Sequence, residues 1–184
     1  MMIEVEVKVS INNIDLCVSE FLDKGFSREA YVEEIDTYYT SEFRDFRVTD
    51  EALRVRESKD LITGKGEAYI TYKGKKLDNV SMSRLEHETK VGNGAIIKQI
   101  LESIGFKPVP PVEKVRIELR RGNISACIDD VKGLGGFLEL EILVQKEEQR
   151  EEALTEIERT LKQLGLEMSN SITQSYLSML EKIS

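Results

Sequence analysis

The sequence predicts an α+β fold in which helices cover the apolar face of an antiparallel sheet. Short segments in which charged and apolar residues alternate recur along the chain, and four longer segments have the apolar spacing of helices. Because the side chains of a strand point to opposite faces with period two, each alternating segment has one charged and one apolar face. Such a sheet can lie open with its charges in solvent, or close into a barrel with the charges inside.

Three of the predicted strands carry two glutamates at alternate positions: Glu4 and Glu6 in EVEVKV, Glu86 and Glu88 in LEHETKV, and Glu139 and Glu141 in LELEILV. The first strand adds Lys8 to the same face. Alternation of this kind also arises wherever one face of a strand is in water. Its repetition in three strands favours a site for divalent cations, which prefer hard oxygen ligands.

Further strands place cations on the charged face, together with one more acid: Arg54 and Arg56 in ALRVR, Lys73 in YITYKG, Arg84 in SRLEHE, Lys114 and Arg116 in KVRIELR, and Asp129 in SACID. With Lys8 and the six glutamates, seven cations then balance seven carboxylates. Two divalent cations raise such a site to roughly +4, which matches the charge of about −4 on a triphosphate. The charges therefore favour joint binding of metal and triphosphate.

Four segments are predicted to be helices: 13–24, 93–104, 147–164 and 172–183. The first two begin at an asparagine, which suits an N-cap, and the first three are followed by a glycine, which suits a left-handed C-terminal position. Between the strands of Asp129 and Glu139, the glycines of KGLGGF predict a tight hairpin turn.

Composition indicates the class of protein. A chain of 184 residues without a linker of biased composition predicts a single domain over residues 1–184. The net charge of −8 argues against a nucleic-acid partner, and no apolar segment is long enough to cross a bilayer. There is no secretory signal, and Cys17 and Cys127 form no CxxC pair, so we expect reduced thiols in a cytoplasmic protein.

Several familiar chemistries are absent from the sequence. There is no G-x-x-x-x-G-K-[ST] loop for phosphate and no G-x-S-x-G element for a serine nucleophile. The only histidine, His87, is on the apolar side of its strand, which argues for a structural role and against a histidine base or a zinc cluster. Cys127 shares the parity of Asp129 and is expected to serve packing.

Taken in order, these segments resemble the CYTH superfamily, named for class IV adenylyl cyclases and thiamine triphosphatase and also called the triphosphate tunnel metalloenzymes. The E-x-E-x-K of Glu4, Glu6 and Lys8 matches the signature of that family. The segments EEIDTYYTS, TDEALRVR, YITYKG, SRLEHE, EKVRIEL, CIDDVKGLGGFLELE and SYLSML follow in the family's order. One departure is that Gly74 is followed by Lys75 and Lys76, where many relatives have proline. The polar stretch 74–83 is interpreted as a mobile lid over the tunnel mouth, with the charged surface loop, which is more common, as the alternative for its two lysines.

The resemblance implies an antiparallel, roughly eight-stranded closed tunnel flanked by helices, with Mg2+ or Mn2+ inside. It implies one or two metal ions on Glu4, Glu6, Asp129, Glu139 and Glu141. It also implies that phosphate oxygens are held by Lys8, Arg54, Arg56, Lys73, Arg84, Lys114 and Arg116, with Glu4, Glu6 and Lys8 as the catalytic set. Glu86 and Glu88 are expected either to bind metal or to hold neighbouring arginines in place.

Two enzymatic activities agree with this resemblance. An adenylyl cyclase converts ATP to cyclic AMP and pyrophosphate, whereas a triphosphatase hydrolyses the terminal phosphate of tripolyphosphate or thiamine triphosphate. The sequence is most similar to class IV adenylyl cyclase-like proteins, so a cyclase is the first expectation. A non-catalytic module that binds polyphosphate or nucleotides is a third alternative, and the sequence also allows a homodimer.

Overall fold

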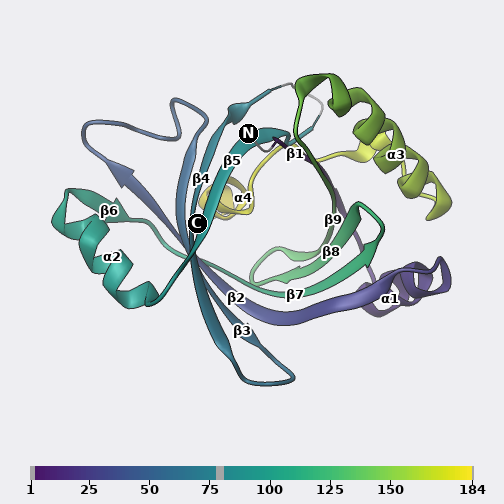
Figure 1. Cartoon of the computed structure of the whole chain (residues 1–184), viewed down its shortest axis with the longest axis horizontal. Coiled ribbons are helices and arrows are strands. Elements are labelled where there is room, and N and C mark those ends of the chain that lie inside the picture. Colours follow the sequence, from purple (N-terminus) through teal and green to yellow (C-terminus); the bar gives the residue numbers. More distant parts are fainter. Residues whose placement is uncertain (1–2, 78–80, 184) are drawn as a thin grey trace.

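A closed barrel of eight antiparallel strands forms the centre of the molecule, as the computed structural model of the chain shows for residues 3–77 and 81–183 (Figure 1). Its strands are β1 (Ile3–Ser10), β2 (Ser27–Ser41), β3 (Ala52–Asp60), β4 (Gly66–Lys76), β5 (Arg84–Val91), β7 (Val112–Arg121), β8 (Ile124–Val131) and β9 (Gly135–Val144). They are hydrogen-bonded in the order β3-β4-β5-β1-β9-β8-β7-β2, and pairing of β2 with β3 closes the ring. The expected α+β tunnel is confirmed.

Closure depends on β2, which at 15 residues is long enough to pair with three other strands. Residues 27–36 of β2 pair with β7, whereas residues 32–39 pair with β3. The end of β2 pairs with the short strand β6 (Phe106–Pro108). A register shift between Arg28 and Ala30 marks a bulge near the start of β2, where a bulged strand bends more strongly.

Both faces of β1 are buried, which an open sheet with its charges in solvent would not produce. Val5, Val7 and Val9 face the helices and are at most 1% exposed. On the opposite face, Glu6 and Lys8 are only 6% and 2% exposed. The polar faces of the strands therefore line an enclosed interior, which decides between the two arrangements that the alternation allowed.

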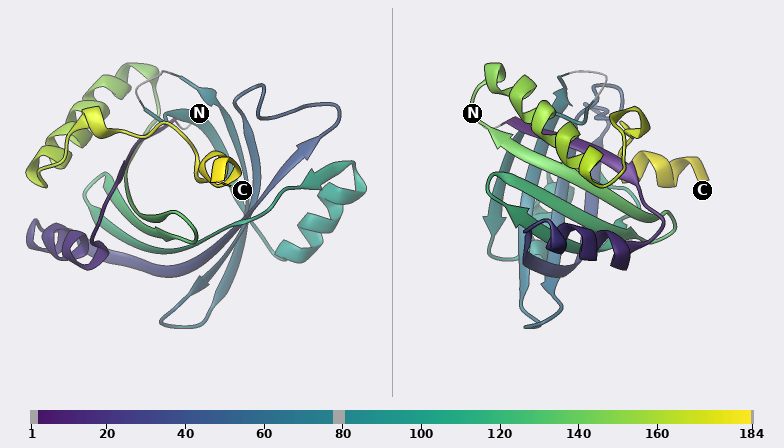
Figure 2. Two further views of the ribbon diagram at one scale, coloured as in Figure 1. Left: turned by 180° about the vertical axis from the view of Figure 1, so that it is seen from behind. Right: turned by 90° about the vertical axis from the view of Figure 1, so that its right-hand side faces the viewer.

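Three helices pack on the outer face of the barrel (Figure 2). Helices α1 (Ile14–Asp23) and α3 (Arg150–Gln163) cover the side made by β1, β8 and β9, where Phe21, Ile157 and Leu161 are fully buried. Helix α2 (Gly94–Ser103) covers β3 and β4. The side chains of Asn13 and Asn93 cap α1 and α2 as predicted, accepting backbone hydrogen bonds of 2.9 and 3.1 Å.

The fourth helix, α4 (Tyr176–Ile183), lies at one open end of the barrel (Figures 1 and 2). It packs on residues at the ends of three strands, Val112, Val131 and Phe137. The predicted helix began at residue 172, but residues 172–175 are not helical. Instead, the N–H of Ile172 donates a 2.8 Å hydrogen bond to the carbonyl of Lys8, which ties this segment to the rim of β1.

Two predicted connections can be compared with the structure. The turn between β8 and β9 is confirmed, and Gly133 and Gly135 have φ angles of 85° and 92° that favour glycine. The predicted lid differs, because residues 74–76 continue β4 and Met82 donates its N–H to the carbonyl of Glu6. Residues 78–80 of that segment lie outside the described residues. Within the described part of the chain, no helix combines the length and apolar character needed to span a membrane.

Candidate active site

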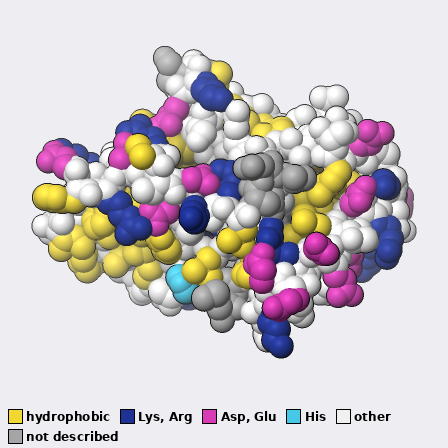
Figure 3. Space-filling view, turned by 90° about the horizontal axis from the view of Figure 1, so that it is seen from above, with side chains coloured by type: hydrophobic (Ala, Val, Ile, Leu, Met, Phe, Trp, Pro, Cys, Tyr) yellow, Lys and Arg dark blue, Asp and Glu magenta, His cyan; other side chains and the backbone are white. Residues whose placement is uncertain are grey.

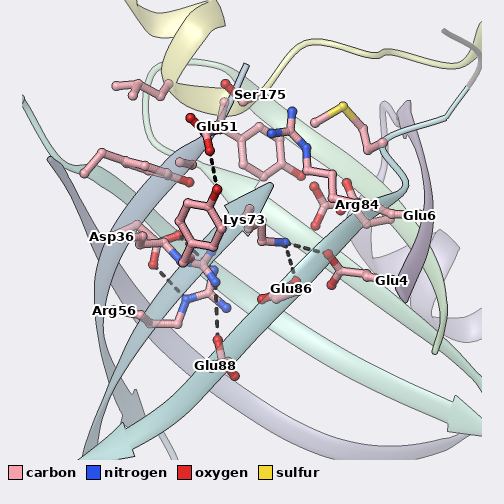
Figure 4. A pocket seen from close by; sticks show the side chains of 18 of the residues that line it. Glu4, Glu6, Asp36, Glu51, Arg56, Lys73, Arg84, Glu86, Glu88 and Ser175 are labelled. Atoms are coloured by element: carbon pink, nitrogen blue, oxygen red, sulfur yellow. Dashed lines mark hydrogen bonds and ion pairs between the residues drawn. The ribbon is translucent and has the colours of Figure 1, made fainter. Parts of the chain in front are cut away.

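The interior of the barrel contains a cavity of about 1490 Å3, to which the inner faces of all eight barrel strands and the start of α4 contribute. Every predicted phosphate-binding cation lines it: Lys8, Arg54, Arg56, Lys73, Arg84, Lys114 and Arg116. Four of the five predicted metal ligands line it as well, namely Glu4, Glu6, Glu139 and Glu141. Asp129, the fifth, is fully buried in the cavity wall. Figure 4 shows how the side chains of one part of the cavity converge.

Three of these carboxylates form a cluster that we call the acidic triad: Glu4, Glu6 and Glu141. One oxygen of each lies within 4.8 Å of the others. The cluster exists because Glu6 is directly opposite Glu141 in the β1–β9 pair, and Glu4 is two residues before Glu6 on the same face. Carboxylate oxygens at this spacing are a suitable set of ligands for a hard divalent cation.

The triad concentrates negative charge away from water. Burial, followed by the charge of Glu139, raises the pKa of Glu6 to about 7. Burial and the charge of Glu4 raise the pKa of Glu141 well above its ordinary value. Glu4 differs: burial opposes its ionisation, but the charges of Lys73 and Arg54 and hydrogen bonds with Glu86 and Lys73 together lower its pKa to about 2. A bound cation would therefore relieve the repulsion between Glu6 and Glu141.

Lys73 joins the triad to the neighbouring strand β5. Its ammonium lies 2.6 Å from Glu4 and 2.9 Å from Glu86 (Figure 4). Glu88 contacts Arg54 at 3.5 Å and accepts a 2.7 Å hydrogen bond from Thr71. Glu88 thus contacts an arginine, as one of its two expected roles requires, whereas Glu86 contacts a lysine.

A second group, the Asp129 centre, pairs its acids with cations. The guanidinium of Arg116 donates two hydrogen bonds of 2.6 Å to Asp129, and Lys114 donates a third of 3.0 Å. Glu139 contacts Lys8 at 3.1 Å and also accepts a hydrogen bond from Arg116. Burial opposes ionisation, but these cations outweigh it and lower the pKa of both Asp129 and Glu139. Both predicted metal ligands are thus engaged with basic side chains.

Strand β2 contributes two carboxylates that the prediction of site residues missed. Asp36 accepts hydrogen bonds of 2.7 and 2.8 Å from Arg56 and one of 3.2 Å from Arg54. Glu34 lies 3.1 Å from Arg56 and 3.4 Å from Lys114. The alternate spacing of Glu34, Asp36 and Tyr38 could have placed them on one face.

These two acids change the charge balance inferred from the sequence. Lys76, Glu118 and Arg120 line the cavity as well. With Glu34 and Asp36, the described strands then place ten carboxylates and nine cations at the cavity or in its wall. The seven acids and seven cations inferred from the sequence were therefore an incomplete set, and the case for a metal ion rests on the acidic triad.

One end of the tunnel is bordered by the segment between β2 and β3. Arg84 donates hydrogen bonds of 3.0 and 3.3 Å to the carbonyl and carboxylate of Asp50 and one of 3.2 Å to the carbonyl of Gly74. Lys76 also donates to Asp50, at 2.5 Å. Arg84 thus differs from the deeper cations, because most of its acceptors belong to the rim.

His87 and Cys127 are on the sides of the wall that their parity predicted. His87 is exposed, as its cyan colour at the surface in Figure 3 shows, and its ring stacks on Tyr72 with centroids 6.4 Å apart. It is therefore a surface side chain and not a core histidine. Cys127 is buried at the cavity, where burial raises the pKa of its thiol well above the ordinary value.

Comparison with known proteins agrees with this architecture. A protein of Methanocaldococcus jannaschii named "Putative adenylate cyclase" is 39% identical over 97% of this chain and 98% of its own length. A solved structure from Pyrococcus horikoshii has a TM-score of 0.89 and 34% identity, and covers 98% of this chain and 99% of that chain. A Hippeastrum protein shares the fold at 16% identity, with a TM-score of 0.69 and coverage of 100% of this chain and 97% of its own.

The family assignment is consistent with the tunnel that the strands form. Residues 2–176 match the family description "CYTH domain". This match extends from the strand that carries Glu4 and Glu6 to the first residue of α4, and so includes every element of the barrel. The chain therefore belongs to the CYTH domain family.

Proposed function

We propose that this protein is a divalent-metal-dependent enzyme that binds a triphosphate inside the tunnel and cleaves one of its P–O bonds. The observation that carries the proposal is the presence, in one cavity, of the acidic triad and seven basic side chains. A site for anions alone gains nothing from three carboxylates within 4.8 Å of one another.

The acidic triad is the proposed metal site, for Mg2+ or Mn2+. Its three oxygen donors suit such hard cations, and two of its carboxylates contact cations of the wall only at long range: Glu6 lies 3.9 Å from Lys8, and Glu141 lies 3.8 Å from Arg116. A divalent ion bound there would neutralise charge on phosphate oxygens. Glu139 and Asp129 are proposed to act through Lys8, Lys114 and Arg116.

The seven cations are proposed to hold the triphosphate itself. In the structure each one is paired with a carboxylate of the wall or rim, as in the contacts of Arg56 with Asp36 and of Lys73 with Glu4. These carboxylates hold the cations in place, so that phosphate oxygens can replace or share their contacts. Preorganised cations of this kind stabilise negative charge that develops in the transition state.

We propose adenylyl cyclase as the first activity. In that reaction the ribose 3′-oxygen of ATP bonds to the α-phosphorus, its proton passes to solvent, and pyrophosphate leaves. The support is the name of the Methanocaldococcus jannaschii relative, which aligns over nearly all of both chains at 39% identity. The residues of the tunnel would bind the triphosphate, and the nucleoside would extend toward one end.

Triphosphate hydrolysis is the second candidate, and a specific observation favours it. The cations contact carboxylates around the whole wall, from β1 through β2, so the tunnel could hold tripolyphosphate without a nucleoside. The Hippeastrum protein, which has the same fold, is described as having a dominant triphosphatase activity.

One assay separates these activities. Purified protein with Mg2+ or Mn2+ receives ATP, tripolyphosphate and thiamine triphosphate in parallel, and the Glu6→Gln variant is the control. Cyclic AMP with pyrophosphate identifies a cyclase, and released orthophosphate identifies a triphosphatase. Tight binding without any product would identify a non-catalytic binding module and contradict the proposal.

A further inference from the structure

Tyr176, the first residue of α4, extends from the end of the barrel into the cavity wall. The side chain is only 6% exposed, and its ring packs against Phe137 of β9 with centroids 5.1 Å apart. The residue is separated from β1 by more than 160 positions in the sequence, so nothing in the local sequence pattern suggested a role for it in the site.

The ring of Tyr176 faces two cations of the tunnel. The ammonium nitrogen of Lys8 lies 4.1 Å from the ring centroid, and that of Lys114 lies 5.3 Å away. Both distances are within the range of an attractive cation–π contact, which strengthens when the cation is removed from water. The two lysines are 2% and 4% exposed, so this condition is met.

The hydroxyl of Tyr176 contacts the Asp129 centre as well. It donates a 2.9 Å hydrogen bond to Oδ2 of Asp129, the same oxygen that accepts from Lys114. Burial and the charges of Glu139 and Asp129 raise the pKa of Tyr176, so its hydroxyl keeps the proton that it donates. One side chain thus touches two cations and the acid between them.

The residues before Tyr176 complete the surroundings of Lys8. The Lys8 ammonium donates a 3.3 Å hydrogen bond to the carbonyl of Gln174, and the Lys8 carbonyl accepts from Ile172. Segment 172–176 therefore contacts both the backbone and the side chain of Lys8. Lys8 is therefore contacted by this segment as well as by Glu139.

We propose that Tyr176 is a positioning residue of the tunnel, whose ring holds Lys8 and Lys114 in the arrangement that accepts phosphate and is itself anchored by the hydrogen bond from its hydroxyl to Asp129. A buried ammonium needs partners, because removal from water is costly. A further carboxylate would supply one, but its charge would repel the phosphate. An aromatic ring stabilises both lysines without adding a negative charge to the tunnel.

The effect that we expect on ligand binding rests on the proposed function. The expected position of the two lysines does not depend on that function. The test therefore has two measurements on wild-type protein and on the Tyr176→Phe, Tyr176→Leu and Met179→Ala variants. Met179 packs in the α4 contact without lying beside the lysines, so its variant reports the effect of looser helix packing alone. NMR of 13C,15N-labelled protein locates the ε-methylene protons of Lys8, and calorimetry measures tripolyphosphate binding in Mg2+.

We expect the Lys8 ε-protons to be shifted upfield by the ring current in wild type and in Tyr176→Phe, and to return to ordinary values in Tyr176→Leu. We expect Tyr176→Leu to weaken tripolyphosphate binding by about tenfold, which corresponds to about 1.4 kcal/mol. Tyr176→Phe keeps the ring and should bind within about threefold of wild type. Met179→Ala should behave as wild type in both measurements.

The proposal is overturned by an unshifted Lys8 in wild type, by unchanged affinity in Tyr176→Leu, or by an equal loss in Met179→Ala. If wild-type protein binds no tripolyphosphate at all, the proposed function fails. The NMR comparison then still decides the position of Lys8 through nuclear Overhauser contacts between its ε-protons and Glu139, which lies 3.1 Å from the Lys8 ammonium. Loss of these contacts in Tyr176→Leu but not in Met179→Ala supports the positioning role, and their persistence in Tyr176→Leu overturns it.

Discussion

Two groups of carboxylates lie inside the same tunnel, but they differ in the cations that each one contacts. Asp129 accepts three hydrogen bonds from Arg116 and Lys114 and a fourth from Tyr176. In the acidic triad, Glu4 is paired with Lys73 at 2.6 Å. Among the described residues, however, Glu6 and Glu141 approach cations only at 3.9 and 3.8 Å. Cations lower the pKa of Asp129, whereas burial and neighbouring acids raise that of Glu6 to about 7. Contacts with cations therefore distinguish an acid that organises basic side chains from one with capacity for a metal ion.

The largest predicted effect concerns the Asp129 centre. We expect Asp129→Asn to lower the free energy of unfolding by about 3–5 kcal/mol, because buried Arg116 and Lys114 lose the carboxylate that accepts three of their hydrogen bonds. Urea denaturation measures this loss. Glu33→Gln, at an exposed position of β2, serves as the control. An unchanged urea midpoint for Asp129→Asn would contradict the distinction between the Asp129 centre and the acidic triad.

The next effect concerns activity and the acidic triad. We expect Glu6→Gln to reduce metal-dependent turnover at least about 100-fold, or about 2.7 kcal/mol, because one ligand of the metal loses its charge. Stability should not fall, since the substitution removes repulsion between buried acids. Turnover and urea midpoints are measured on the same preparation. A loss below about tenfold would be too small for a metal ligand and would contradict the assignment.

The raised pKa of Glu6 also predicts how stability depends on pH without metal. The folded protein binds this proton more tightly than the unfolded chain, whose value is 4.5. The resulting stabilisation is complete below about pH 4.5 and is lost as pH rises through about 7. We expect the free energy of unfolding to fall by on the order of 1–3 kcal/mol between pH 5 and 8.

Denaturation in a chelator, repeated with Mg2+ and with Glu6→Gln, checks this dependence. Mg2+ should restore stability mainly at the higher pH, and Glu6→Gln should flatten the curve. A wild-type free energy of unfolding that rises steadily from pH 5 to 8 would contradict the raised pKa of Glu6. It would thereby contradict the difference between the acidic triad and the Asp129 centre.

The smallest effect concerns the cations held by Asp36. We expect Arg54→Ala to weaken triphosphate binding by about tenfold, or about 1.4 kcal/mol, because it removes one guanidinium that is proposed to bind phosphate. Lys59→Ala, an exposed cation on the same strand, is the matched control. Calorimetry with tripolyphosphate in Mg2+ compares them. Equal affinities in both variants would count against the role of Arg54.

Strand parity alone predicted much of the site. It placed Arg54 and Arg56 on the inner face, as it did Glu4 and Glu6, because apolar residues separate each pair. Parity missed Glu34 because Glu33 and Glu34 are adjacent, which interrupts the alternation of charged and apolar residues in β2. Parity gives the face on which a side chain lies, but not which side chains meet across the barrel.

Contacts between side chains across the barrel depend on the register of the paired strands and on closure of the sheet. The triad forms because Glu6 pairs with Glu141 from a strand 135 positions later, and Asp36 meets Arg54 and Arg56 because β2 closes on β3. The helix predicted from residue 172 begins at Tyr176, because the preceding residues bond to β1 instead of forming a helical turn. Contacts between distant segments, which decide these points, leave no local pattern in the sequence.

The most direct test of the account is calorimetric titration of Mn2+ into wild type and Glu6→Gln, each with and without tripolyphosphate. If triad and cations form one site, tripolyphosphate tightens Mn2+ binding in wild type, Mn2+ tightens tripolyphosphate binding by the same factor, and Glu6→Gln loses both effects. Identical Mn2+ binding by the two proteins would contradict a shared metal and triphosphate site inside the barrel. So would an affinity for either ligand that does not change when the other ligand is present.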